Sequence, residues 1–324
     1  MLLRAAMASS ALPPLLLLVL LLAPSSAHAA RKESLSGPMI EQWGYHNDRN
    51  SKFHPANSSS FQLVALGRVN LTFLDNTHLE GYDGQDFVEI GGFRAETRMG
   101  MVTSCNSRNF NDVDGIVGFG WDDSNRSSAI LKTLSTPSRP HWNITQPPPF
   151  VPMRNAFSFT ADGTGGELQL GGYDPECIEG GMDTFPMMGW AYGANVSSIR
   201  YGGEELLRFG AAPEGANGTY RGYVGDFDSG TTCVLLPNST SGGRLVAPPF
   251  QRLLELQNKG IRDDLVFTIA GREYPIPFNE CVEPSGAELI LGDPFFRRFV
   301  VLHDMTDPSD KRMGLGRRRE SYRV

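Results

Sequence analysis

The nonapeptide at residues 224–232, Val-Gly-Asp-Phe-Asp-Ser-Gly-Thr-Thr, limits most strongly what this chain can fold into. Its first half places β-prone Val224 and Phe227 in the alternating pattern of a strand. Asp228 follows, and next to it come a glycine that permits a tight reversal and hydroxyl groups that can hold a carboxylate. The nonapeptide therefore predicts one oriented acid at the tip of a β-loop. On its own it is more typical of an ordinary Asp-Ser-Gly turn between strands.

Other segments of the chain favour the first interpretation. In order, these are residues 114–120, 166–174, 288–296, 299–304 and 312–316. Together with the nonapeptide, and at these spacings, they resemble the pepsin-like aspartic peptidases from about Phe53 to the end of the chain. Each piece is a weak signal, and the combination is a strong one.

The resemblance implies an all-β, bilobal pepsin-like fold with a truncated first lobe. The 36 glycines and 22 prolines, with few helical periods, also favour an all-β chain. We predict a signal peptide at 1–29, a truncated N-terminal lobe at 30–188 that carries a flap hairpin, and a C-terminal lobe at 189–324. The repeated apolar-apolar-Gly segments at 116–118 and 290–292 are consistent with two related lobes.

The resemblance also implies an aspartic endopeptidase that hydrolyses peptide bonds through an Asp-activated water. Asp228 is the catalytic acid, and the active-site loop continues through Ser229, Gly230, Thr231 and Thr232. The chemistry needs two carboxylates that share a proton, because neighbouring acids cannot both ionise cheaply. A lone Asp228 is expected to titrate near the reference value of about 4.

The second acid is not found by its motif. No Asp-Thr-Gly or Asp-Ser-Gly occurs before Phe73, and Asp48 and Asp75 are poor substitutes. Two main alternatives stay open: an endopeptidase whose written sequence lacks a segment, or a secreted, catalytically dead relative that binds peptides or proteins in its cleft. A surface glycoprotein without a cleft function is a third, and a dimer that pairs two Asp228 residues is a further way to supply an acid.

The alternating segment from Val69 predicts a β-hairpin, which by resemblance is the flap over the substrate. Its tip carries Phe73 and Asp75, where the family has a Tyr-Gly-x-Gly sequence. If Phe73 replaces the flap tyrosine, the hydroxyl that normally bonds near the site is missing.

The first residues predict passage through the secretory pathway. Arg4, an apolar stretch at 15–22 and Ala27-His28-Ala29 have the pattern of a cleaved signal peptide. After cleavage we expect no membrane span, and an extracellular or acidic luminal location. The 29 basic and 36 acidic residues give a net charge of −7, and loss of Arg4 makes it −8. This balance argues against nucleic acid as a partner.

The remaining predictions concern modification, partners and local structure. The histidines show no metal-ligand spacing, so we expect neither metal nor cofactor, and a monomer that binds a peptide or protein substrate or ligand. Cys233 and Cys281 are predicted to form a disulfide, although Cys233 could instead be a buried thiol. Strands are expected at 157–160, 167–170, 266–269 and 274–276, and helices at 124–134 and 249–259. Seven Asn-x-Ser/Thr sequons predict glycosylation: Asn57, Asn70, Asn125, Asn143, Asn195, Asn217 and Asn238.

Overall fold

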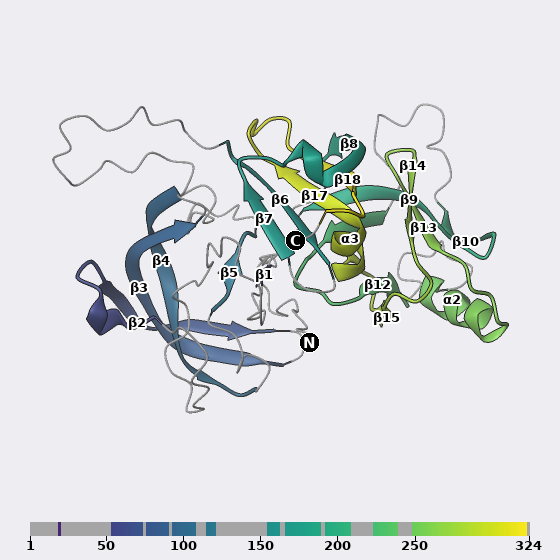
Figure 1. The fold of residues 1–324 in the computed structure, drawn as a ribbon. Coiled ribbons are helices and arrows are strands. Elements are labelled where there is room, and N and C mark those ends of the chain that lie inside the picture. The colour runs from purple at the N-terminus through teal and green to yellow at the C-terminus, as the bar shows by residue number, and fades with distance from the viewer. Residues whose placement is uncertain are drawn as a thin grey trace.

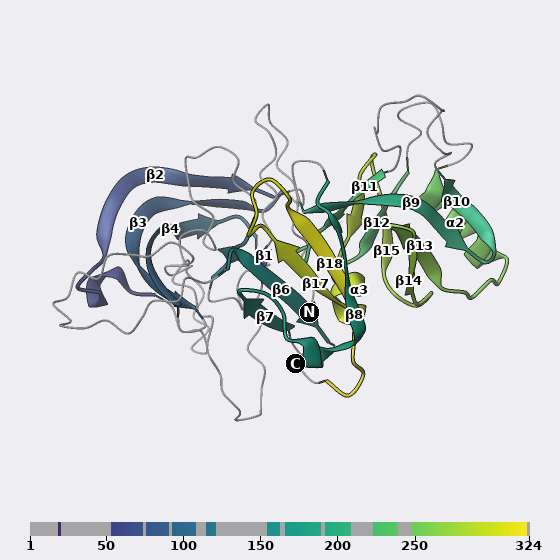
Figure 2. The same ribbon diagram turned by 90° about the horizontal axis from the view of Figure 1, so that it is seen from above.

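The computed structural model describes residues 53–73, 76–90, 93–107, 115–120, 154–162, 166–188, 192–208, 223–238 and 248–322, and the backbone of a short strand β1 (Val19–Leu20). Three larger β-sheets follow one another along the molecule (Figure 1). The eight-stranded sheet lies at one end, the three-stranded sheet at the other, and the five-stranded sheet between them (Figures 1 and 2). The all-β architecture predicted from the sequence is confirmed.

The eight-stranded sheet has the order β14-β13-β9-β11-β16-β12-β15, with β10 paired to β9. Alternation of buried and half-buried side chains along β13 shows the strand period that the sequence predicted. Ala270, with a φ of 51°, and Gly271, with a φ of 77°, form the tight turn between β13 and β14. The strands of the eight-stranded sheet are β9 (Gly193–Tyr201), β10 (Glu204–Arg208), β11 (Tyr223–Phe227), β12 (Val234–Pro237), β13 (Leu265–Ile269), β14 (Arg272–Ile276), β15 (Val282–Ser285) and β16 (Leu289–Leu291).

The five-stranded sheet joins segments that lie far apart in the sequence. Its order is β7-β6-β17-β18-β8, and every neighbouring pair is antiparallel. It takes strands from both sides of the predicted boundary at residue 188. The strands are β6 (Ala156–Ala161), β7 (Gly166–Leu170), β8 (Ile178–Pro186), β17 (Phe299–Asp304) and β18 (Arg312–Arg318), and the 3-10 turn η2 (Pro175–Cys177) leads into β8.

The three-stranded sheet contains the hairpin predicted from the alternation after Val69. It pairs β2 (Gln62–Thr72), β3 (His78–Ile90) and β4 (Phe93–Cys105), in that order, and follows the 3-10 turn η1 (Pro55–Asn57). The long strand β4 was not predicted. Strand β5 (Val117–Gly118) lies apart from this sheet and pairs antiparallel with β1.

Two α-helices complete the described elements. Helix α2 (Pro249–Asn258) was predicted, and it buries Leu253 and Leu256. Helix α3 (Asp293–Arg298) was missed because six residues are too few to show a helical period. Its Phe295 and Phe296 are fully buried in the main hydrophobic core. Within the described ranges, no helix is long and apolar enough to cross a membrane.

The C-terminal half carries one disulfide and a basic run near its end. The predicted Cys233–Cys281 disulfide is confirmed. Within the basic run at 317–319, the exposed Arg319 donates to the backbone oxygens of Glu176 and Ile178. The predicted helix at 124–134 lies outside the described residues.

Candidate functional site

Asp228 lies directly after β11, in the turn that leads to β12. Strand β11 pairs with β16 in parallel, and the Asp228 amide donates to the Leu291 carbonyl oxygen at 3.2 Å. The Thr231 amide donates back to the Asp228 carbonyl oxygen at 3.1 Å, which closes the turn. The nonapeptide therefore folds as the sequence predicted: a strand followed by a tight acidic loop.

Gly292 lets a second segment pass close behind this loop. A Cβ there would lie 2.2 Å from the Cys233 carbonyl oxygen and 2.4 Å from the Thr231 carbonyl oxygen. Its φ of −83° is open to any residue, so space rather than backbone conformation requires glycine. The close approach allows the Asp293 amide to donate to the Thr231 carbonyl oxygen at 2.8 Å. The acidic loop is thereby tied to the start of α3.

Both carboxylate oxygens of Asp228 accept hydrogen bonds from the loop. The Gly230 amide donates to Oδ1 at 2.9 Å, and the Thr231 hydroxyl donates to Oδ2 at 2.7 Å. The Asp228 residue is only 8% exposed. Such bonds fix the orientation of the carboxyl group, as a reacting acid requires.

Burial raises the pKa of Asp228 to about 6, although the bonds from Thr231 and Gly230 act in the opposite direction. The expectation that a single Asp228 would titrate near its reference value was therefore wrong. The sequence gave no measure of burial, and burial is the largest cause of the shift in the pKa of Asp228.

Asp226 is a second acid at the site, and the sequence analysis missed it. Burial is the main reason that its pKa rises to about 7, and the charges of Asp228 and Glu288 raise it further. Residues two apart on a strand point to the same face. This rule applied to β11 would have placed Asp226 beside Asp228.

The other residues of the predicted loop have distinct environments. Gly230 and Thr231 are buried, whereas Ser229 and Thr232 are half-buried. The Ser229 hydroxyl oxygen is covered and has no hydrogen-bond partner within the described part of the chain. A covered hydroxyl without a partner is unfavourable by about 1–3 kcal/mol.

The predicted flap tip is a tight turn between β2 and β3. The Phe73 amide donates to the Thr77 carbonyl oxygen at 2.8 Å, and the Asn76 amide donates to the Phe73 carbonyl oxygen at 2.9 Å. Asn76 has a φ of 63°, a conformation that asparagine tolerates better than most residues. Phe73 is buried, at 7% exposure, and Asp75 lies outside the described residues, as does Asp48.

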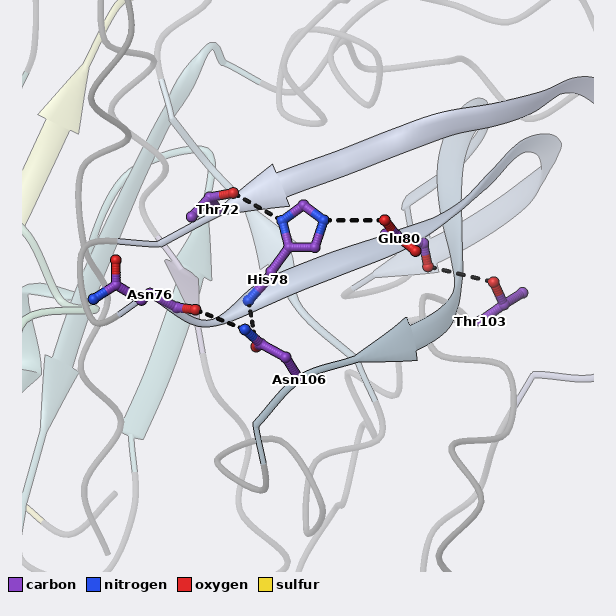
Figure 3. Close-up of polar contacts among 6 residues, drawn as sticks. All are labelled: Thr72, Asn76, His78, Glu80, Thr103 and Asn106. Atoms are coloured by element: carbon purple, nitrogen blue, oxygen red, sulfur yellow. Dashed lines mark hydrogen bonds and ion pairs between the residues drawn. The ribbon is translucent and has the colours of Figure 1, made fainter.

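Asn106, just beyond β4, fastens this turn from the side (Figure 3). Its Oδ1 accepts from the His78 amide at 2.7 Å, and its Nδ2 donates to the Asn76 carbonyl oxygen at 2.9 Å. His78 also joins its own neighbours, with Nδ1 2.8 Å from the Thr72 hydroxyl and Nε2 3.3 Å from a Glu80 carboxylate oxygen. The tip is thus held by a small polar cluster.

The described sequons differ in exposure. Asn57 and Asn70 are exposed, whereas Asn195 and Asn238 are half-buried, and the other three lie outside the described residues. Glycosylation stays a prediction. A group of metal-ligand residue types also occurs at Cys233, Cys281 and Glu283. Its two sulfur atoms are bonded to each other and are therefore not thiolate ligands.

Comparison with known proteins identifies the family to which this site belongs. The family model described as eukaryotic aspartyl protease matches residues 41–316. The chain belongs to this family. Syncephapepsin of Syncephalastrum racemosum is 25% identical over 79% of the chain, and pepsin A of Suncus murinus is 24% identical over 82%. The matches span 66% and 70% of those two proteins, respectively.

A solved structure supports the same fold. The aspartic proteinase from Irpex lacteus superimposes with a TM-score of 0.59 at 19% identity, over 80% of this chain and 83% of its own. Membership of the aspartyl protease family and the pepsin-like fold are therefore confirmed. In the geometry described above, Asp228 is an oriented and buried acid of an aspartyl protease chain, and Asp226 is a carboxyl group next to it.

Proposed function

We propose that this chain is a pepsin-like aspartic endopeptidase in which Asp228 supplies one of the two reacting acids. The observation that carries the proposal is the Asp228 loop, where the two carboxylate oxygens are held by the Gly230 amide and the Thr231 hydroxyl. A lobe with a purely structural role has no need of a buried acid, because burial of a charge is costly.

The pKa of Asp228 suits either half of the reaction. With a pKa of about 6, the group is mainly protonated in a mildly acidic medium and can donate a proton to the scissile carbonyl oxygen. Once ionised, it can take a proton from the attacking water. Aspartic peptidases are the standard example of two carboxyl groups that divide these roles between them.

The proposal requires a partner acid close to Asp228. The covered Ser229 hydroxyl shows that this side of the loop has an unused bonding position in the described chain. We expect the partner acid on a segment that packs against this side.

The test is a cleavage assay on a denatured protein at about pH 4, with and without a peptide that contains statine, which mimics the tetrahedral transition state. Asp228→Asn should lower kcat/KM by at least about 10³-fold, because the acids act as a unit. The matched control is Asp263→Asn, at an exposed position away from the loop, which should leave the rate unchanged. Cleavage that resists the inhibitor and survives Asp228→Asn would contradict the proposal.

A peptide-binding role without catalysis is the second candidate. Phe73 favours it, because a buried phenylalanine at the hairpin tip has no hydroxyl to offer the site. A folded chain that binds the statine peptide with no measurable cleavage would establish this role. For either role, we propose a peptide or protein as the ligand and the secretory pathway as the location, with the leader at 1–29 removed.

A further inference from the structure

We propose that Asp226 selects substrates with a lysine or arginine side chain next to the scissile peptide bond. This inference rests on the proposed function, since it assigns a substrate class to the same site. It concerns a residue that is not one of the two acids of the reaction.

The first support is the alternation of side chains along β11. Phe227 is fully buried and packs edge-on against Phe295 in the core. On the opposite face, Val224 is 37% exposed, Asp226 is half-buried and Asp228 is buried beyond the end of the strand. Asp226 therefore lies on the face that carries the reacting acid, and not in the core.

The second support is Gly193, the first residue of β9. Because it has no side chain, it leaves space for the Asp226 carboxyl group. A Cβ on Gly193 would lie 2.8 Å from Asp226 Oδ1 and 2.4 Å from Val224 Cγ1. Gly193 is aligned with Asp226 across the strand pair. Any larger residue there would crowd the carboxyl group.

The third support is charge. No hydrogen bond or ion pair connects the Asp226 carboxyl group to the described residues, although Asp228 and Glu288 lie near enough to raise its pKa by their charges. A half-buried carboxylate without a cation is unfavourable. A substrate ammonium or guanidinium group would supply the missing opposite charge.

The spacing between Asp226 and Asp228 along the chain indicates where this cation lies relative to the scissile bond. Two residues along a strand span about 7 Å. An extended peptide advances by about 3.3–3.6 Å for each residue. A substrate whose scissile carbonyl meets Asp228 therefore presents a side chain to Asp226 from within about two residues of that bond.

The raised pKa of Asp226, about 7, adds a dependence on pH. In the empty site the carboxyl group is mainly protonated at pH 4.5 and carries little charge. At pH 6.5 a larger fraction is ionised, and a bound cation favours the ionised form further. The preference for a basic side chain should therefore grow as the pH rises.

The experiment compares two statine peptides that differ only in one flanking residue, lysine or the uncharged norleucine, with that residue placed on each side of the statine in turn. Binding is measured by calorimetry at pH 4.5 and pH 6.5, so no turnover is needed. On one side of the statine, the lysine peptide should bind at least about 10-fold more tightly at pH 6.5 and show a smaller preference at pH 4.5. Asp226→Asn should remove the preference, and Asp263→Asn should retain it.

The outcomes distinguish the role of Asp226 from the proposed function. Equal affinity of the wild-type chain for both peptides, on both sides, would overturn the role of Asp226 and leave the proposed function standing. A lysine preference that survives Asp226→Asn would also overturn it. Failure of every peptide to bind would overturn the proposed function, and the inference with it. The wild-type comparison alone can overturn the inference, even if the variant does not fold.

Discussion

The acidic loop at Asp228 and the hairpin tip at Phe73 are both tight turns, but different interactions hold them. The loop is buried, and Gly292 brings a second segment within hydrogen-bond distance of its backbone. At the tip, the Asn106 side chain makes two hydrogen bonds to the turn backbone, and both are exposed to solvent. Buried contacts hold a geometry against water, whereas exposed hydrogen bonds compete with it.

This difference suggests a division of labour. A reacting acid must keep its orientation, and the packed loop provides that. The flap role that the sequence predicts for this hairpin requires it to open and close, and a few exposed bonds permit local opening at a low free energy. Four measurements can sharpen or break this contrast, beginning with the one for which we expect the largest effect.

Gly292→Ala should lower the free energy of unfolding by about 3 kcal/mol or more, because overpacking against backbone atoms cannot be relieved by a side-chain rotation. The new Cβ would meet the Cys233 and Thr231 carbonyl oxygens. Urea unfolding measures the effect. Gly286→Ala is the matched control, since a Cβ there meets only a Glu288 carboxylate oxygen at 3.4 Å. Equal stability of the two variants would show that the loop is not tightly packed.

The pH dependence of stability should reveal the buried acid. The folded-state pKa of Asp228, about 6, is higher than its unfolded value, so this group adds stability as the pH falls from 7 towards 4. Two pKa units correspond to about 3 kcal/mol. Asp228→Asn should therefore be more stable than the wild type at pH 7, by an amount that disappears near pH 4. A difference that does not change with pH would contradict the burial of this charge.

His303 in β17 changes the stability with pH in the opposite direction to Asp228. Its contribution must therefore be measured separately. Its ring is fully buried and stacks on Phe157 at 4.2 Å, and burial lowers its pKa to about 3. Because the folded pKa lies below the unfolded value of about 6.5, His303 costs stability as the pH falls from 6.5 towards 3. His303→Phe should remove this loss and should leave the effect of Asp228→Asn unchanged.

Asn106→Ala should have the smallest effect, about 1 kcal/mol, because the two lost hydrogen bonds are exposed. We expect amide exchange at His78 to become about 5-fold faster, with little change in global unfolding. Asn155→Ala is the matched control, since Asn155 donates to the Met305 carbonyl oxygen away from the hairpin. Unchanged exchange at His78 would show that Asn106 does not fasten the tip.

Local patterns in the sequence predicted much of the fold. Alternation identified the β6–β7 and β13–β14 hairpins, and the apolar positions after Pro249 identified α2. The strand and turn around Asp228 were also predicted, as was the Cys233–Cys281 disulfide. These features depend on the preferences of neighbouring residues, which the sequence shows directly.

Other features depend on contacts between distant segments. Strands β17 and β18 enter the same sheet as β6 and β8, although more than a hundred residues separate them in the chain. No local pattern specifies that pairing, because it is selected by the burial of apolar faces from the whole chain. The short helix α3 was missed for the same reason, since its phenylalanines are fixed by the core and not by a helical period.

The sequence by itself determined that this chain is a β-protein of the aspartyl protease family with Asp228 at the tip of a tight loop. Only the tertiary structure decided the electrostatic character of that loop. Burial raises the pKa of Asp228, and the face of β11 adds Asp226 beside it. The physical reason is that a pKa responds to desolvation and to nearby charge, and both are set by how the strands of the eight-stranded sheet pack around the loop.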